Sequence, residues 1–181
     1  ERNKRNNHVG GVLWLTGLSA SGKTTIASKV ERKLFDKGYN IYMLDGDNLR
    51  DGLNSNLGFS DQDRNENIRR ASEVANILAE SGFIVIASFI TPTKQDREIA
   101  KSNNKTKFYE VYISASIKKC EERDPKGLYK KARLGEIKDF TGISAAYDEP
   151  KNPDITIDTE TLSEIESSDI LSKYIEKNFP I

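Results

Sequence analysis

A glycine-rich segment that ends in a lysine and a threonine could bind the phosphates of a nucleotide. Residues 17–24 read Gly-Leu-Ser-Ala-Ser-Gly-Lys-Thr and fit the pattern G-x-x-x-x-G-K-[ST] at every fixed position. In such a segment the glycines let backbone N–H groups point at phosphate oxygens, the lysine adds a positive charge, and the final hydroxyl can bind Mg²⁺. The segment predicts a nucleoside triphosphate site in which the ammonium group of Lys23 is exposed to phosphate rather than buried in the core.

Two carboxylates at the end of an apolar run could supply acid–base chemistry. Asp45 and Asp47 stand two residues apart in the segment Leu-Asp-Gly-Asp-Asn, at the carboxyl end of a predicted strand, where open α/β sheets bind ligands. One carboxylate can hold the water shell of Mg²⁺, and the other can accept the proton of an attacking hydroxyl. A simple β-turn is the alternative. No apolar strand of the chain ends in a switch-type Asp-x-x-Gly segment, which disfavours a GTPase and leaves a mechanical ATPase or a small-molecule kinase.

Arginines are concentrated in the middle of the chain. An arginine side chain ends in a planar fork that can bind phosphate or sulfate at two points, so this concentration suggests that the acceptor of the phosphoryl group is itself an anion. The alternative for each arginine is an ion pair on the surface, and we favour that alternative for Arg69, Arg97 and Arg133. The arginines of this region are Arg50, Arg64, Arg69, Arg70, Arg97, Arg123 and Arg133.

Two phenylalanines lie in polar segments that contain glycine, which is unusual for residues of a hydrophobic core. Phe59 follows Leu-Gly, and Phe140 precedes Thr-Gly. A pair of aromatic rings could hold a nucleotide base between them, since stacking contributes about 1 to 3 kcal/mol per base. Partial burial of each ring as an anchor for its loop is the alternative.

Five strand-sized runs of apolar and β-branched residues alternate with segments whose apolar residues recur every three or four positions. The helical pattern is clearest at Thr24–Lys37 and Asn65–Ser81. Continuous apolar strands that alternate with helices are typical of a parallel sheet covered on both faces. We therefore predict an α/β fold, a three-layer sandwich with a five-stranded parallel sheet and helices on both faces. The strands are expected at Val12–Thr16, Ile41–Leu44, Phe83–Phe89, Phe108–Ile113 and Ile155–Ile157.

The segment from Arg123 to Gly142 interrupts this alternation. It opens with Arg-Asp-Pro-Lys-Gly and continues with Lys130, Lys131 and Arg133, which is too much charge to face a core. A mobile lid over a bound ligand would explain a charged element at this place. A solvated surface helix is the alternative.

Length and composition limit the classes of protein to which the chain can belong. Its 181 residues are enough for one domain with a real core, and its 28 Lys and Arg residues balance 28 Asp and Glu residues. A net charge of zero provides no general attraction to nucleic acid or to an anionic membrane. The one cysteine, Cys120, favours a reducing compartment such as the cytoplasm. The first residue is not Met, so an organelle stays open if a leader has been removed.

Together these segments resemble the adenylylsulfate kinase family. The resemblance covers residues 9–160, and the Leu-Gly-Phe-Ser and Lys-Gly-Leu-Tyr segments are far more specific than the phosphate loop. It implies a P-loop kinase domain over residues 9–181, preceded by a polar arm at residues 1–8 and carrying a mobile lid at residues 123–142. The segments that carry the resemblance are Trp14–Thr25, Leu44–Arg50, Leu57–Ser60, Asp63–Arg70, Glu121–Arg133 and Phe140–Ile143.

The resemblance implies transfer of a phosphoryl group from ATP to the ribose 3′-hydroxyl of adenosine 5′-phosphosulfate, a step of sulfate assimilation, with Mg²⁺ bound at the nucleotide. It also implies a homodimer, and the chain could be one domain of a fusion with ATP sulfurylase. The implied catalytic residues are Lys23, Asp45 and Asp47, and the implied metal ligands are Thr24 and Asp45. ATP is implied to contact Gly17, Leu18, Ser19, Ala20, Ser21, Gly22, Lys23, Thr24, Thr25 and Arg123. The acceptor is implied to contact Asp47, Arg50, Phe59, Arg64, Asn67, Ile90, Thr91, Lys138 and Phe140.

Two features of the sequence leave the identity of the phosphoryl acceptor open. The third strand runs into Ile90-Thr-Pro-Thr, where the family usually has Ile-Ser-Pro and an aromatic residue. Arginine forks also recognise a charged anhydride without identifying its terminal group, so a kinase of another 5′-modified nucleotide is an alternative, as is a P-loop ATPase coupled to partner binding. Bacterial relatives are often assigned a serine phosphoryl carrier at the position of Thr91. Threonine has restricted rotation at χ1, and the one histidine of the chain, His8, lies in the arm and is not available as a base for its hydroxyl. We therefore expect Thr91 to carry no phosphoryl group.

Overall fold

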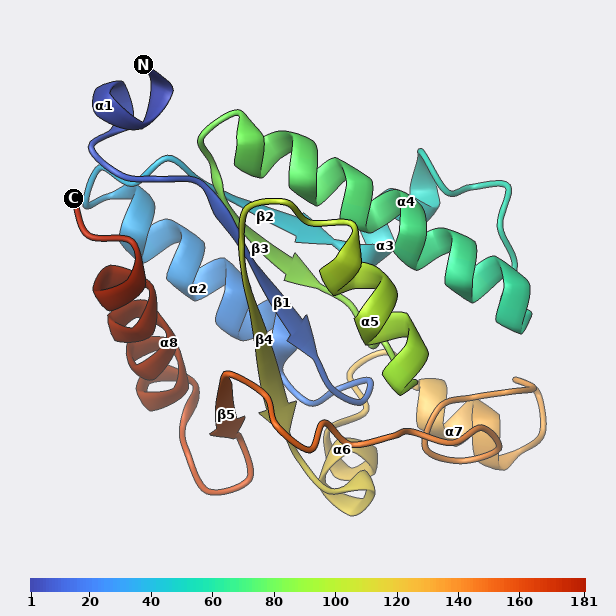
Figure 1. Cartoon of the computed structure of the whole chain (residues 1–181). Helices are drawn as coiled ribbons and strands as arrows, with labels where there is room; N and C mark the ends of the chain where they lie inside the picture. Colours follow the sequence, from blue (N-terminus) through green and yellow to red (C-terminus); the bar gives the residue numbers. More distant parts are fainter.

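The computed structural model describes all 181 residues, Glu1–Ile181, and is built around a five-stranded sheet (Figure 1). All neighbouring strands are parallel, and their order across the sheet is β2-β3-β1-β4-β5. The five predicted strands are confirmed, and no strand end differs from its prediction by more than one residue. The strands are β1 (Gly11–Thr16), β2 (Ile41–Asp45), β3 (Ile84–Ser88), β4 (Lys107–Ser114) and β5 (Ile155–Asp158).

Helices follow the strands along the chain. The helix predicted from Asn65 begins earlier, at Asp61, because the Ser60 hydroxyl accepts a hydrogen bond from the backbone N–H of Asp63 and caps the first turn. That turn is polar, so its residues carry no apolar periodicity. The helices are α1 (Arg2–Asn6), α2 (Lys23–Phe35), α3 (Gly46–Asp51), α4 (Asp61–Glu80), α5 (Lys94–Ser102), α6 (Ile117–Arg123), α7 (Leu128–Arg133) and α8 (Glu164–Asn178).

Each face of the sheet has its own hydrophobic core. On one face Leu13 and Leu15 of β1 pack with apolar residues of α2 and α8. On the other face Val12 and Trp14 of β1 pack with α4 and α5, which present small alanine side chains. All four β1 residues are fully buried because the strand is covered on both sides. The two helical layers are visible on either side of the sheet in Figure 1, and the predicted three-layer sandwich is confirmed.

The arm at residues 1–8 packs at the amino ends of the strands. The Asn6 side chain donates to the carbonyl of Gly82, 3.1 Å away, just before β3. His8 is buried, and its Nε2 accepts a hydrogen bond from the backbone N–H of Asn40, just before β2. The arm is therefore at the opposite end of the sheet from the phosphate loop, which follows the carboxyl end of β1. No helix is both long enough and apolar enough to cross a membrane.

Candidate functional site

The phosphate loop joins the carboxyl end of β1 to the amino end of α2. Gly17 has a φ of 151°, and a Cβ atom there would lie 2.4 Å from the carbonyl oxygen of Ile113, so no larger residue fits. Gly22, with a φ of 104°, directly precedes the first helical residue, Lys23. The loop therefore wraps around a helix amino terminus, where the unpaired backbone N–H groups and the helix dipole favour an anion.

Lys23 is buried, so the expectation of an exposed ammonium group is wrong. The residue is only 8% exposed, and its Nζ donates to the carbonyl oxygens of Gly17 and Leu18 at 2.9 and 2.7 Å. These contacts draw the charge into the centre of the loop. Burial lowers the pKa of Lys23 to about 8, against the opposing effect of neighbouring acidic groups that include Asp45 and Asp47.

This lowered pKa predicts a pH dependence of nucleotide binding. Below pH 8 the ammonium group of the free enzyme is charged, and above it the neutral amine predominates, so binding of an anionic phosphate there requires uptake of a proton. We expect the association constant for ATP to fall as the pH rises through about 8. Titration calorimetry on both sides of this pH measures the effect, and Lys23→Met should remove it. A constant affinity in the wild-type protein would contradict the assignment.

Three oxygen-bearing side chains meet beside the loop. The Thr24 hydroxyl donates to Oδ2 of Asp45 at 3.0 Å and lies 3.4 Å from the Ser88 hydroxyl at the end of β3. Hydroxyl and carboxylate oxygens are the ligands that Mg²⁺ prefers, and the ion commonly shares its coordination with substrate phosphates. No group of three or more His, Cys, Asp or Glu side chains could hold a metal by itself. The sequence reasoning did not identify Ser88, because a serine at a strand end has no local signature.

Asp45 also places Asp47. Its Oδ1 accepts the backbone N–H of Asp47 at 2.9 Å and so caps α3, which fixes the second carboxylate at the start of that helix. The side chain of Asp47 is exposed and forms an ion pair with Lys126, between α6 and α7. This hydrogen bond raises the pKa of Lys126. Lys126 was missed as a site residue although it lies in the Arg-Asp-Pro-Lys-Gly segment, whereas the predicted Lys138 is exposed on the segment after α7.

Two arginines come together without a carboxylate partner. The guanidinium of Arg50 lies 4.4 Å from the centroid of the Phe59 ring and donates to the carbonyl of Gly58 at 3.0 Å. Arg64 donates to the carbonyl of Phe59 at 2.9 Å. Burial, followed by the positive charge of Arg64, lowers the pKa of Arg50. Neither guanidinium is within ion-pair distance of a carboxylate, so the pair is suited to bind an anion.

Most of the other arginines are paired. Arg69 contacts Glu66, and Arg133 contacts Glu121, which confirms the surface ion pairs favoured for them. The prediction of a surface pair is wrong for Arg97, which is 8% exposed. Its helix, α5, lies against the sheet and turns this side chain inward.

The predicted aromatic pair is brought to one region but is not in contact. Phe59 is 65% exposed, whereas Phe140 packs edge-on against Tyr129 with 4.9 Å between ring centroids. Arg64 joins the two segments, because it also donates to the carbonyl of Asp139 and to the hydroxyl of Thr141, the latter at 3.0 Å. The role of both rings in holding a base therefore stays a prediction.

The predicted lid is tied to the phosphate loop at its base. Arg123 donates to the Thr159 hydroxyl at 3.0 Å and reaches the carbonyl of Ala20 at 3.4 Å. Tyr129 is 1% exposed, and its hydroxyl donates to the carbonyl of Ser19 at 3.0 Å. Residues 133–136, at the tip of this segment, are exposed. Sequence reasoning did not identify Tyr129, whose partner is 110 positions away in the chain.

Three other predicted acceptor contacts lie deeper in the protein. Asn67 is buried, and its Oδ1 accepts a hydrogen bond from Nδ2 of Asn54 at 2.9 Å. The carbonyl of Ile90 accepts from the Thr16 hydroxyl at 2.7 Å. Thr91 is 1% exposed and lies beyond the end of β3 with a φ of 48°.

The buried hydroxyl of Thr91 takes part in hydrogen bonds both as an acceptor and as a donor. Its Oγ1 accepts from Nε1 of Trp14 at 2.9 Å and donates toward the carbonyl of Phe89 at 3.4 Å. A phosphoryl group there would break both contacts and bring charge into a buried place. We expect γ-labelled ATP to leave the protein unlabelled. Label at Thr91 that chases into product at the rate of turnover would replace direct transfer with a two-step mechanism.

Comparisons with known proteins agree with this geometry. A family model described as adenylylsulphate kinase matches residues 9–158, which include the phosphate loop, both aspartates and the lid. The adenylyl-sulfate kinases of Bacillus pumilus and Clostridium acetobutylicum are each 52% identical to this chain, over 98% of it and over 90% and 88% of their own lengths. The structure of the Mycobacterium tuberculosis APS kinase CysC in complex with AMPPNP and APS aligns with a TM-score of 0.90 at 47% identity, covering 93% of this chain and 98% of that one.

Proposed function

The chain belongs to the adenylylsulfate kinase family, and we infer that it transfers the γ-phosphoryl group of ATP to the ribose 3′-hydroxyl of adenosine 5′-phosphosulfate. The products are 3′-phosphoadenosine 5′-phosphosulfate and ADP. One observation in the site carries this conclusion: Arg50 and Arg64 are drawn together without carboxylate partners, in a protein that also holds a phosphate loop. A nucleotide hydrolase needs no second anion site of this kind.

We propose direct in-line transfer in a single step. The 3′-hydroxyl oxygen bonds to the γ-phosphorus of ATP while the bond from that phosphorus to the β,γ-bridging oxygen breaks, and the electron pair leaves on ADP. Asp47 accepts the hydroxyl proton, and Lys126 places a positive charge beside it. Lys23 and the backbone N–H groups of residues 17–25 stabilise the phosphate charge. Thr24 and Asp45, with Ser88 beside them, would hold Mg²⁺, which offsets the charge of the β- and γ-phosphates when bound.

The acceptor is proposed to lie between α3, the start of α4 and the segment after β3. Arg50, Arg64 and Asn67 would bind its phosphosulfate and ribose, and Phe59 and Phe140 its adenine. Lys138 and the Ile90–Thr91 turn line the same region in this proposal. Arg123 approaches the base of ATP, which is consistent with its position across the phosphate loop.

Residues 123–142 are proposed to close over both nucleotides. The part of this segment that lies beside the phosphate loop is anchored by Tyr129 and stays in place, while the exposed tip moves. Closure excludes water, which would otherwise compete with the ribose hydroxyl for the γ-phosphorus. The Arg64 contacts to Asp139 and Thr141 would then link closure to the acceptor side of the site.

The remaining proposals concern the protein in the cell. A cytoplasmic location is supported by the bacterial relatives and by Cys120, which is a free cysteine. We propose a homodimer of a domain that spans residues 9–181, in line with the family resemblance. The acceptor is a mixed anhydride of phosphate and sulfate, so a reaction that joins sulfate to the adenylyl group of ATP must supply it, and association with an ATP sulfurylase would serve that purpose.

A coupled assay of ADP release tests the proposed function. We expect turnover with adenosine 5′-phosphosulfate to exceed turnover with AMP or another 5′-modified nucleotide, and release without acceptor to be slight. Equal release without any acceptor would identify an ATPase. Faster turnover with a different 5′-modified nucleotide would identify a related kinase.

Arg50→Met should raise the KM for the acceptor more than the KM for ATP. The change removes a charged fork but keeps an unbranched side chain against Phe59, and a charge-assisted hydrogen bond contributes about 1.5 to 3 kcal/mol. Steady-state kinetics with each substrate varied in turn measures the two constants. Arg69→Met, on the exposed face of α4, is the matched control and should change neither. Equal effects of Arg50→Met on both substrates would remove Arg50 from the acceptor site.

A further inference from the structure

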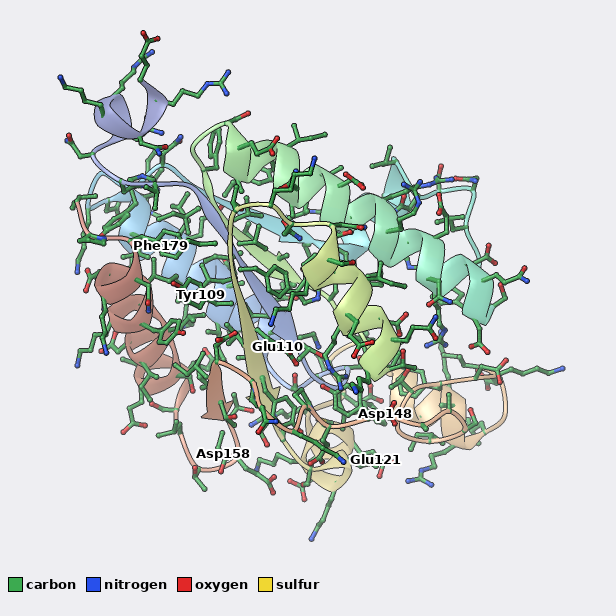
Figure 2. All side chains as sticks on the ribbon, in the orientation of Figure 1. Tyr109, Glu110, Glu121, Asp148, Asp158 and Phe179 are labelled. Carbon is green, nitrogen blue, oxygen red and sulfur yellow. The ribbon has the colours of Figure 1, made fainter.

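A partly buried ion pair lies behind the acceptor side of the site and has no role in the chemistry described so far. Nε of Arg97, on α5, is 3.2 Å from Oε1 of Glu110, on β4. Figure 2 shows Glu110 on β4 beside α5. A guanidinium does not lose its charge in a protein, and an apolar pair of similar volume is often at least as stable as a buried ion pair. Stability is therefore a weak explanation for this pair.

The Arg97 guanidinium holds a strained turn. Its Nη1 donates to the carbonyl oxygen of Thr91 at 3.3 Å. Thr91 has a φ of 48°, a left-handed conformation that β-branched residues rarely adopt. The Thr16 hydroxyl is also 3.3 Å from the Thr91 carbonyl oxygen, but it has only one proton to donate. That proton goes to the carbonyl oxygen of Ile90, which is closer at 2.7 Å. Arg97 is thus the main donor to the Thr91 carbonyl, and an apolar residue could not replace it.

The same turn contacts the start of the phosphate loop. The Ile90 carbonyl accepts both the Thr16 hydroxyl and, at 3.4 Å, the backbone N–H of Gly17. The Tyr147 hydroxyl lies 3.0 Å from that of Thr16, and because the Thr16 proton is already used, Tyr147 is the donor. A displacement of the turn would therefore change the spacing between the acceptor side and the phosphate loop.

We propose that Arg97, held by Glu110, is a positioning residue that keeps Thr91 in its left-handed conformation and so sets the place of the acceptor relative to the phosphate loop. The inference rests on the proposed function, in which the acceptor lies beside this turn. Neither Arg97 nor Glu110 is among the substrate contacts proposed above. Without the guanidinium the turn can relax, while Lys23 keeps its own contacts within the loop.

The double variant Arg97→Met/Glu110→Met tests the proposal kinetically. It replaces the ion pair by an apolar pair and should keep the fold. We expect the KM for adenosine 5′-phosphosulfate to rise about ten-fold, in line with the loss of one charge-assisted hydrogen bond, and the KM for ATP to change less than about two-fold. The matched control is Arg32→Met/Asp36→Met, which removes an exposed ion pair at the carboxyl end of α2 and should change neither constant.

A spectroscopic measurement tests the turn independently of activity. Trp14 is the only tryptophan of the chain, its Nε1 donates to Oγ1 of Thr91, and its ring stacks on Phe89 with 4.9 Å between centroids. Its fluorescence emission should shift in the Arg97→Met/Glu110→Met variant and not in the control. If the double variant fails to fold, Arg97→Lys carries the same measurements, because lysine keeps the charge but lacks the planar fork whose Nε faces Glu110 while its Nη1 faces the Thr91 carbonyl.

The outcomes separate this proposal from the proposed function. An emission shift with a selective rise in the KM for the acceptor supports positioning. Unchanged emission, or a lower kcat with both KM values unchanged, would show that the pair serves only the fold. If the wild-type protein does not phosphorylate adenosine 5′-phosphosulfate, the proposed function fails, whereas the Trp14 signal still reports whether Arg97 holds the turn.

Discussion

Lys23→Met is expected to lower kcat by about three orders of magnitude. Methionine keeps the unbranched stem that fills the buried path to the loop, but it supplies no charge to phosphate and no donor to the carbonyls of Gly17 and Leu18. Loss of one preorganised group that stabilises transition-state charge lowers kcat by about 10² to 10³-fold. Because Lys23 also draws the loop together, the effect should be at the upper end of that range. Steady-state kinetics at saturating ATP measures it.

Lys29→Met is the matched control for this change. Lys29 is on the same helix, α2, is partly exposed and pairs with Glu164 at 3.1 Å. Its loss should leave kcat unchanged, since a surface ion pair contributes about 0 to 1 kcal/mol to stability. Thermal unfolding of both variants shows whether the fold persists. A Lys23→Met enzyme with more than about a tenth of the wild-type kcat, which is a loss below about 1.4 kcal/mol, would refute the role of the loop.

Asp47→Asn is expected to lower kcat by about 10² to 10⁴-fold, the usual contribution of a general base. The amide keeps the shape of the side chain but cannot accept the proton of the attacking hydroxyl. The cap of α3 is made by Asp45 and is not affected, so the helix should stay formed. Because Asp47 is not proposed to bind ATP phosphate, the KM for ATP should change little. The pH dependence of kcat reports the loss of the basic group.

Two further variants separate the possible roles of Asp47. Lys126→Met removes the ion-pair partner and keeps the carboxylate, so it should lower kcat much less than Asp47→Asn. Equal losses in the two variants would mean that Asp47 serves to hold the segment that carries Lys126, and not to accept a proton. Asp51→Asn, at the exposed end of α3, is the matched control and should retain full activity.

The fold could be predicted closely because its signals are local. A strand buried on both faces must be apolar along its length, and a helix against a sheet must repeat its apolar residues every three or four positions. Both patterns are present in the chain, so the strand ends were predicted to within one residue. The one large difference, the earlier start of α4 at Asp61, arises where a polar first turn is held by the Ser60 cap instead of by packing.

The partners of charged side chains could not be predicted in the same way. Residue type alone does not separate Arg50, Arg97 and Arg133, yet one contacts an aromatic ring, one is buried beside Glu110 and one lies in a surface ion pair. Spacing along the chain does not determine these contacts, because the residues that meet are brought together by the packing of α5 and of the segment 123–142. The error at Lys23 has the same cause, since the depth of the ammonium group depends on how the loop folds over it.

The sequence by itself therefore determined the layers of the sheet, the phosphate loop and the place of the aspartates at a strand end, because each depends on neighbours within one turn or one strand. The tertiary structure alone decided that Lys126 meets Asp47 across 79 positions, that Arg64 meets Thr141 across 77, and that Trp14 and Arg97 enclose Thr91. Contacts between residues so far apart in the sequence form only when separate elements pack, and many pairings are compatible with the same composition. Packing selects one of them, through shape and the need to give each buried polar group a partner.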